Sequence, residues 1–276
     1  DPIGLVGHFA RAIRRELNLT REARTLDEFQ RLFRNDATLT VPAVFRDLSS
    51  DTVLTMDFID GYRIDSPETL TQLGIDCSAL AANGARIFLK QAFELGIFHG
   101  DPHPGNIRVL ADGALCLLDY GMVGHLDEKT RDSLIDLLVA IVRRDAAAAV
   151  KVVEEIGQPF AEIDRSLLRA EIRDFIDTYY GVELNRLDIG HLLGDFLTIL
   201  VSHGIRCPGD LMLLIRALVT LEGVGRTLDP EFNLAGVLQP FVRSAVRQRY
   251  SPTRIAGDII HDVKTLAAAA HKVPVS

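Results

Sequence analysis

The stretch from Gly96 to Gly121, GIFHGDPHPGNIRVLADGALCLLDYG, constrains this chain more than any other. Two short apolar runs, IRVL and ALCLL, flank an Asp-Gly pair, and this arrangement is a strong signal for a β-hairpin. The predicted hairpin folds Asp119 back beside Asn106 and Asp101. Three oxygen-bearing side chains are therefore expected to converge on one small volume.

The order of these three side chains points to phosphoryl transfer. That chemistry needs a carboxylate that orients the acceptor hydroxyl or water, and hard oxygen ligands that hold magnesium on the phosphates. Protein kinases carry their motifs in the same order as this stretch: a catalytic Asp, an Asn five residues later and then an Asp-aromatic-Gly, here Asp101, Asn106 and 119–121. His99-Gly100-Asp101 stands in place of the kinase His-Arg-Asp. A single Asp in this stretch would be read as a turn former, but the ordered set favours a nucleotide site.

The same stretch allows a rival interpretation as a transition-metal site. His99, Asp101 and His103 alternate as HxDxH, and all three are possible metal ligands. Pro102 and Pro104 interrupt the pattern, and no other His or Cys cluster lies near it in sequence. We therefore prefer the kinase-like interpretation, in which His103 is a loop residue that hydrogen-bonds a neighbouring backbone group or carboxylate.

Composition limits the class of protein. The chain has 276 residues and is 47% hydrophobic, which is enough for a substantial core in one large domain or two small ones. Its formal charge of -8 argues against nucleic-acid binding. The three cysteines are scattered without metal-ligand spacing, which favours a reducing compartment. No uncharged apolar run reaches the length of a membrane span, and we expect no signal peptide.

The periodicity of apolar residues predicts a helix, a strand pair and then a mostly helical body. The first helical stretches are 4–17 and 22–33, and the β-prone runs 41–45 and 52–58 read as an antiparallel pair across a turn cluster. The later helices are expected to begin at Pro67 and to cover 77–95, 127–142, 145–156, 165–180, 189–203, 208–225, 239–248 and 253–270.

These residues resemble the UbiB/ADCK family of atypical kinases, which is associated with ubiquinone (coenzyme Q) biosynthesis. The resemblance covers nearly the whole chain and rests on ELNLTREA, VPAVF, VLTMDFIDG, FHGDPHPGNI, LLDYG and LIRALVTLEGVGRTLDPEFN. It implies an α+β, protein-kinase-like fold. Residues 1–60 would form an incomplete small lobe of helix C and two strands, and residues 61–276 a mostly helical large lobe that contains the catalytic-loop hairpin.

The resemblance implies a role for each matching residue around the phosphates. Asp101 would be the catalytic aspartate, and Asn106 and Asp119 would be the magnesium ligands. Glu22 would be the helix-C glutamate that pairs with the nucleotide-binding lysine. ATP and Mg²⁺ are therefore the implied cofactors.

The resemblance also implies a hinge and a family-specific acidic motif. Met56, Asp57 and Phe58 stand where the hinge would hydrogen-bond adenine, although position 57 is more often Glu in the family. Glu16 resembles the first acid of the Glu-x-Asp motif, whose second acid is replaced by Asn18 in this chain.

The family's Lys-x-Gly-Gln motif, Ala-rich loop and strand lysine all precede the helix-C glutamate, and this chain starts after them. Lys90 lies in a later helix and cannot take the lysine's place. We therefore expect a fragment or a truncated homologue that alone binds ATP weakly and turns over little.

The expected function is that of a Mg-ATP-dependent ATPase or small-molecule phosphotransferase that supports quinone-lipid biosynthesis. A composition rich in Ala, Leu, Arg and Asp suggests a bacterial source. The resemblance implies work at a membrane, so we expect a cytoplasmic protein peripheral to the inner membrane, with partners among quinone-pathway lipids or enzymes. The stretch 253–270 could lie on a membrane, but packing on its own lobe is the simpler expectation.

Two alternatives stay open. Aminoglycoside and choline kinases share His-Gly-Asp-x-His-x-Gly-Asn loops, although the block 214–233 argues against them. A pseudokinase scaffold that binds nucleotide without turnover would fit the missing lysine. A protein kinase is disfavoured because little room for an activation segment separates Asp119 from the helix near Asp127.

Overall fold

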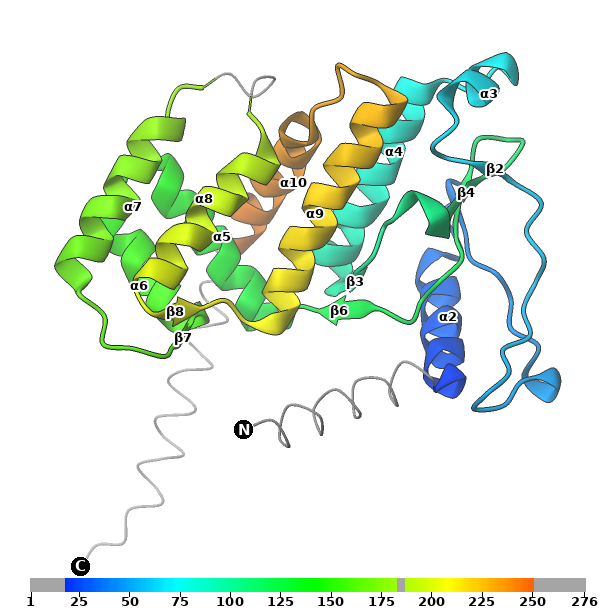
Figure 1. The fold of residues 1–276 in the computed structure, drawn as a ribbon, viewed down its shortest axis with the longest axis horizontal. Coiled ribbons are helices and arrows are strands. Elements are labelled where there is room, and N and C mark those ends of the chain that lie inside the picture. Colours follow the sequence, from blue (N-terminus) through cyan, green and yellow to red (C-terminus); the bar gives the residue numbers. More distant parts are fainter. Residues whose placement is uncertain (1–17, 183–186, 251–276) are drawn as a thin grey trace, which may run out of the picture.

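The computed structural model describes residues 18–182 and 187–250. A mixed sheet with α2 lies at one end of the molecule, and a larger helical body makes up the rest (Figure 1). This organisation confirms the predicted α+β class. The helices are α2 Leu19–Phe33, α3 Pro67–Gln72, α4 Cys77–Leu89, α5 Glu128–Val142, α6 Ala146–Ile156, α7 Arg165–Tyr179, α8 Ile189–Ser202, α9 Gly209–Leu228 and α10 Leu234–Arg249.

The predicted hairpin is present and forms the middle of a four-stranded sheet with the order β1-β5-β4-β2. Its strands are antiparallel, with Ile107 opposite Leu117. One edge strand pairs with β5 in parallel and the other with β4 in antiparallel fashion. The strands are β1 Leu39–Thr40, β2 Tyr62–Arg63, β4 Ile107–Val109 and β5 Leu115–Leu117. The hairpin is thus flanked on both edges by segments that precede α4.

A second antiparallel pair, β3 (Ile97–His99) and β6 (Val123–His125), brings the start of the predicted catalytic loop next to the segment after Asp119. The Gly100 N–H donates to the Met122 carbonyl at 2.8 Å. A third pair, β7 (Gln158–Pro159) with β8 (Ile205–Arg206), lies in the helical body.

The β-prone runs 41–45 and 52–58 pair as predicted, but they do not form continuous strands. They share one antiparallel bridge, Val44 with Met56. Pro42 has no N–H to donate, and the chain turns into a 3₁₀ segment at Arg46–Leu48, so the ladder cannot extend. The sheet takes its edges from residues 39–40 and 62–63 instead.

The helix predicted over 77–95 is confirmed, with a change of pitch. Asp76 accepts hydrogen bonds from the N–H groups of Ser78 and Ala79 and so begins α4. After Leu89 the helix widens into a π-helical segment, Lys90–Leu95, and ends at Gly96, whose φ of 71° is left-handed. The wider segment places Gln91 in the interior.

The helical body follows the predicted order. The N-cap aspartates Asp127, Asp145, Asp164 and Asp188 each accept a backbone N–H, which explains where α5 to α8 begin. The largest boundary error is at α10, which begins at Leu234 rather than at 239, because Asn233 Oδ1 accepts from the Gly236 N–H at 2.7 Å. Helix α2 begins three residues earlier than predicted, and α9 ends three residues later, at Leu228. The predicted helices 4–17 and 253–270 lie outside the described residues, as does Glu16.

Candidate active site

His99 fixes the predicted catalytic loop to the Asp-Tyr-Gly segment. The ring is 1% exposed, and its Nδ1 accepts from the Asp101 N–H at 3.2 Å. Its Nε2 is bonded to the Asp119 carbonyl, which can only accept, so Nε2 carries the proton. Burial lowers the pKa of His99, in agreement with a neutral ring. One imidazole therefore positions both aspartates through their backbones.

Tyr120 holds the same segment from the other side. Its ring is 1% exposed and packs edge-on against Phe29 of α2 and His99, with centroid separations of 4.9 and 5.5 Å. Because Tyr120 points into the core, the side chain of Asp119 is left on the exposed side of the chain. Asp119 Oδ1 accepts from the Gly121 N–H at 2.8 Å.

The hairpin register brings Asn106 to this position. The Leu118 N–H donates to the Asn106 carbonyl at 2.9 Å, so Asn106 lies opposite the residue before Asp119. The Asn106 amide nitrogen lies 3.4 Å from the Asp101 carbonyl, and this contact leaves its side-chain oxygen available to a metal ion. The structure therefore brings Asp101, Asn106 and Asp119 to one end of the hairpin.

Glu22 of α2 reaches the same place. Its Oε1 accepts from the Tyr120 N–H at 3.1 Å. Burial raises the pKa of Glu22, and the nearby Asp119 carboxylate raises it further, against the lowering effect of the Tyr120 N–H. Two carboxylates that face each other in a partly buried site favour a cation between them. Two lysines of the described ranges 18–182 and 187–250 are paired with carboxylates other than Glu22. Lys90 pairs with Asp36 at 3.1 Å, and Lys129 pairs with Glu155.

The predicted hinge residues lie on the connection between β1 and β2. The backbone bonds beside Met56 come from its neighbours: Phe45 N–H to Thr55 and Asp57 N–H to Ala43. Met56 therefore occupies a non-hydrogen-bonded position, where its own N–H and C=O point away from the paired segment. The Asp57 carboxylate is used locally, since it accepts from the Ala43 N–H at 2.9 Å. Phe58 is 93% exposed.

The rival metal site is wrong. Both ring nitrogens of His99 are engaged by backbone groups. His103 is exposed, and its Nδ1 accepts from the Gly105 N–H at 3.1 Å, as the loop-residue interpretation predicted. The part of the chain that the structure describes holds no group of three or more His, Cys, Asp or Glu side chains arranged for a metal ion.

Sequence reasoning missed the residues that position the site. Gln91 is 1% exposed, and its Oε1 accepts from the His99 N–H at 3.0 Å. A polar residue within an apolar helical run was the available signal for it. Tyr120 and Phe29 were missed because aromatic residues next to a motif are ordinarily taken as general core.

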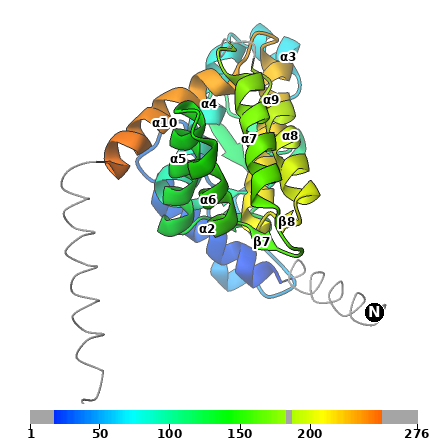
Figure 2. The ribbon, with the colours of Figure 1, turned by 90° about the vertical axis from the view of Figure 1, so that its left-hand side faces the viewer.

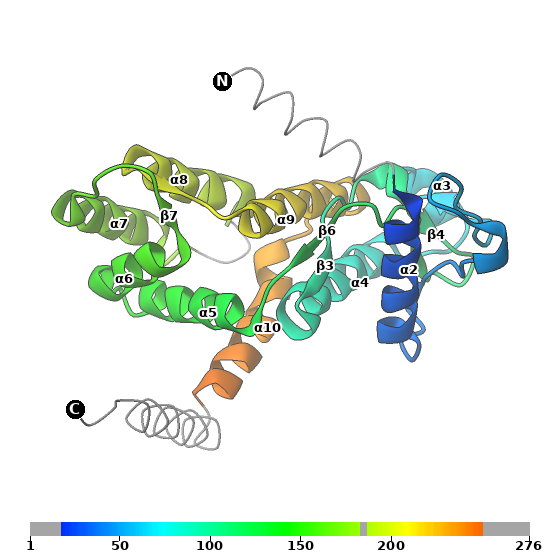
Figure 3. The same cartoon turned by 90° about the horizontal axis from the view of Figure 1, so that it is seen from below.

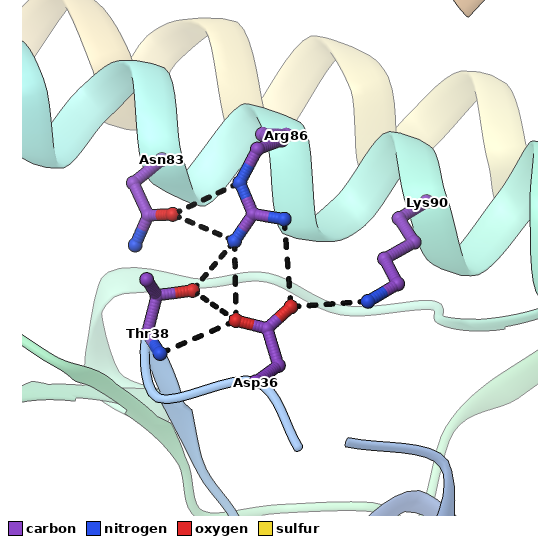
Figure 4. A network of polar contacts seen from close by, with 5 residues as sticks. All are labelled: Asp36, Thr38, Asn83, Arg86 and Lys90. Carbon is purple, nitrogen blue, oxygen red and sulfur yellow. Dashed lines mark hydrogen bonds and ion pairs between the residues drawn. The ribbon is translucent and has the colours of Figure 1, made fainter. Parts of the chain in front are cut away.

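A second polar network joins the segment before β1 to α4 (Figure 4). Arg86 of α4 and Lys90, one helical turn later at the start of the π-helical segment, both reach Asp36, at 3.4 and 3.1 Å. Thr38 donates its hydroxyl to Asp36 at 2.6 Å. Burial alone would raise the pKa of Asp36, but the bonds from Thr38, Lys90 and Arg86 hold it well below its usual range.

Fold and site together define a protein of the kinase-like class. Residues 1–153 match the ABC1 atypical kinase-like domain, and residues 172–233 match the UbiB helical domain. This chain belongs to the ABC1/UbiB family of atypical kinases, as its motifs suggested.

Individual relatives agree with this assignment. The chain is 32% identical over 86% of its length to the protein ACTIVITY OF BC1 COMPLEX KINASE 1, chloroplastic, of Arabidopsis thaliana, of which it covers 35%. It is 29% identical over 99% of its length to a probable protein kinase UbiB of Xanthomonas campestris pv. campestris (strain B100), of which it covers 50%. The chain thus spans between about a third and a half of these relatives.

A solved structure supports the fold. The Rv3197–erythromycin complex from Mycobacterium tuberculosis superposes with a TM-score of 0.60 over 87% of this chain and 62% of that chain. At 18% sequence identity this likeness concerns the fold alone. In the described ranges, no helix has the length and apolar character to cross a bilayer.

Proposed function

We propose that this chain supplies the catalytic side chains of a Mg-ATP-dependent, kinase-like ATPase or small-molecule phosphotransferase. The observation that carries the proposal is that His99, Tyr120 and the hairpin register bring Asp101, Asn106 and Asp119 to one end of the hairpin. Asp119 would bridge the phosphates through Mg²⁺, Asn106 would hold a second ion, and Asp101 would orient the nucleophile.

Two further features support a nucleotide at this site. The close approach of Glu22 to Asp119 asks for a positive group, either Mg²⁺ or the lysine that such glutamates pair with in kinases. The backbone N–H and C=O of Met56 are turned away from their paired segment, so they are available to adenine. Asp57 and Phe58 complete the proposed hinge. Glu16 is the residue that we assign to the family's Glu-x-Asp motif.

The biological role that we propose follows from the family. Relatives include probable protein kinases named UbiB, and the family is linked to ubiquinone synthesis. We place this protein in support of quinone-lipid biosynthesis, in the bacterial cytoplasm and peripheral to the inner membrane, with pathway lipids or enzymes as partners. The phosphoryl acceptor would be a small molecule or water.

The test is calorimetric binding of ADP and ATP, at millimolar concentrations, with Mg²⁺ or with a chelator. We expect Mg²⁺-dependent binding that Asp119→Asn abolishes. Asp112→Asn is the matched control, because it removes the same charge from the tip of the same hairpin while its side-chain oxygen can still accept from the Ala114 N–H. Binding that survives the chelator, or equal binding by both variants, would refute the proposed site.

Turnover separates catalysis from binding. Asp101→Asn is expected to retain nucleotide binding and to lower turnover by orders of magnitude, because it removes the group that orients the nucleophile. Phosphate release should be measured with this chain and with the longer protein. Binding without any turnover in either would favour the pseudokinase scaffold.

A further inference from the structure

The helical body contains a cavity of about 870 Å³. Its lining residues come largely from α5, α8, α9 and α10. In the ribbon, α8 and α9 lie on the opposite side of the helical body from α5 and α10 (Figures 2 and 3). The walls of the cavity are almost entirely apolar, with large side chains from all four helices: Leu138, Leu192, Phe196, Ile215, Leu218 and Val242. None of the residues assigned above to nucleotide or metal lines this cavity.

A cavity of this size is unlike a packing defect. Protein interiors pack as densely as organic crystals, with few voids larger than a water molecule. An engineered void of roughly 150 Å³ lined by Leu, Ile and Phe already stays dry and takes up apolar ligands. This cavity is more than five times larger, and it falls within the range of about 300–1,000 Å³ that is typical of small-molecule sites.

The charged side chains in the described lining of the cavity are all basic. The polar side chains of its lining include Arg143, Arg243 and Arg247, which are all exposed, and Gln239. Arg243 and Arg247 lie one turn apart on α10, and Arg143 directly follows α5, which packs against α10. No acidic residue is among the described residues of the lining, although the chain as a whole has a formal charge of -8.

We propose that this cavity binds one amphiphilic molecule with a long hydrocarbon chain and an anionic head group. The chain would occupy the apolar interior between α8, α9, α5 and α10. The head group would bind Arg243 and Arg247, with Arg143 close by. This inference goes beyond the proposed phosphotransfer and does not depend on it.

The first test uses the fluorescent fatty acid cis-parinarate, whose emission rises in apolar surroundings. We expect saturable binding of one molecule per chain, with displacement by oleate. Leu138→Trp places a large ring in the cavity and should weaken binding by about tenfold or more. Leu167→Trp is the matched control, because Leu167 is 53% exposed on α7 and does not line the cavity. Equal affinity in both variants overturns the proposal.

The second test concerns the head group and does not require filling the core. The double variant Arg243→Gln/Arg247→Gln should bind parinarate several-fold more weakly than the wild type, and its affinity for uncharged methyl parinarate should be unchanged. Arg216→Gln removes an exposed arginine of α9 that does not line the cavity, and it should change neither affinity. An equal effect on both probes, or no effect, contradicts the proposed head-group site.

Two other occupants would also overturn the proposal. If parinarate binds only after deletion of residues 251–276, that segment of the chain fills the cavity. If the protein sediments with phosphatidylglycerol vesicles but gives no one-to-one binding of parinarate, the arginines contact a bilayer surface.

Discussion

Glu22 is the residue whose ionisation should depend most on what the site binds. Its pKa is raised from the ordinary value of 4.5 by burial and by the Asp119 carboxylate. The folded chain therefore holds this proton more tightly than the unfolded chain. The contribution of the protonated Glu22 to the free energy of unfolding is complete below pH 4.5 and is lost as the pH rises through the folded pKa. At neutral pH the two carboxylates repel each other unless a cation is bound.

Replacing Glu22 by Gln tests this repulsion. The variant keeps an oxygen that can accept from the Tyr120 N–H, so without nucleotide at pH 7.5 it should melt above the wild type. That advantage should shrink toward pH 4, where Glu22 becomes protonated. Magnesium and ADP should stabilise the variant less than the wild type. Glu28→Gln, on the same helix, is the control in thermal unfolding. A Glu22→Gln melting temperature equal to that of wild type at both pH values would count against a carboxylate pair.

Tyr120 combines a well-packed ring with an unsatisfied polar atom. Its hydroxyl is buried and has no hydrogen-bond partner, and burial raises its pKa well above the usual range. An unpartnered buried hydroxyl costs roughly 1–3 kcal/mol. Tyr120→Phe should therefore be at least as stable as the wild type in urea unfolding.

Loss of the whole ring should have the opposite effect. Tyr120→Ala removes the contacts with Phe29 and His99, and should lower the free energy of unfolding by about 3–5 kcal/mol. A Tyr120→Phe variant less stable by more than about 1 kcal/mol would show that the hydroxyl is satisfied, since a typical intramolecular hydrogen bond is worth about that much.

At the scale of elements, local patterns were predictable and distant pairings were not. The hairpin β4–β5 could be predicted because Asp112-Gly113 and its flanking apolar runs are adjacent in sequence. The proximity of Asn106 to Asp119 followed from that hairpin. The edge strands β1 and β2 are two residues each and pair with partners far along the chain, so no local period marks them. The bond from the His99 N–H to Gln91 depends on a π-helical segment that sequence does not reveal.

The network around Asp36 is expected to fasten the segment before β1 to α4. The Asp36 side chain is only 12% exposed and meets Arg86, Lys90 and Thr38. Asp36→Asn weakens these charge-assisted bonds and should cost about 1.5–3 kcal/mol in chemical unfolding. Because the folded pKa of Asp36 is depressed, this difference should be present above pH 3.8 and disappear as the pH falls further.

The matched control for Asp36→Asn is Asp65→Asn. It breaks the exposed pair with Arg63, which should contribute about 0–1 kcal/mol. Equal losses in the two variants would mean that the Asp36 network is an ordinary surface contact.

At the scale of the whole molecule, α9 lies between the proposed nucleotide site and the apolar cavity. A Cβ added at Gly100, in the predicted catalytic loop, would lie 2.6 Å from the Leu213 side chain, so the loop backbone rests directly on α9. Leu214 and Leu218, on the same helix, line the cavity. The block 214–233 therefore contributes to the wall of the cavity, and Leu213, the residue just before it, supports the predicted catalytic loop.

The central claim is that Asp119 and Asn106 hold the metal of a bound nucleotide. Its most direct test is anomalous X-ray diffraction from crystals grown with Mn²⁺ and ADP. We predict a manganese peak about 2.0–2.6 Å from the Asp119 carboxylate and the Asn106 amide oxygen, the range of hard-cation ligands. Two results would contradict the claim: bound nucleotide with manganese on neither residue, or a separation of these two groups beyond roughly 10 Å, which is too far for the cations of one triphosphate.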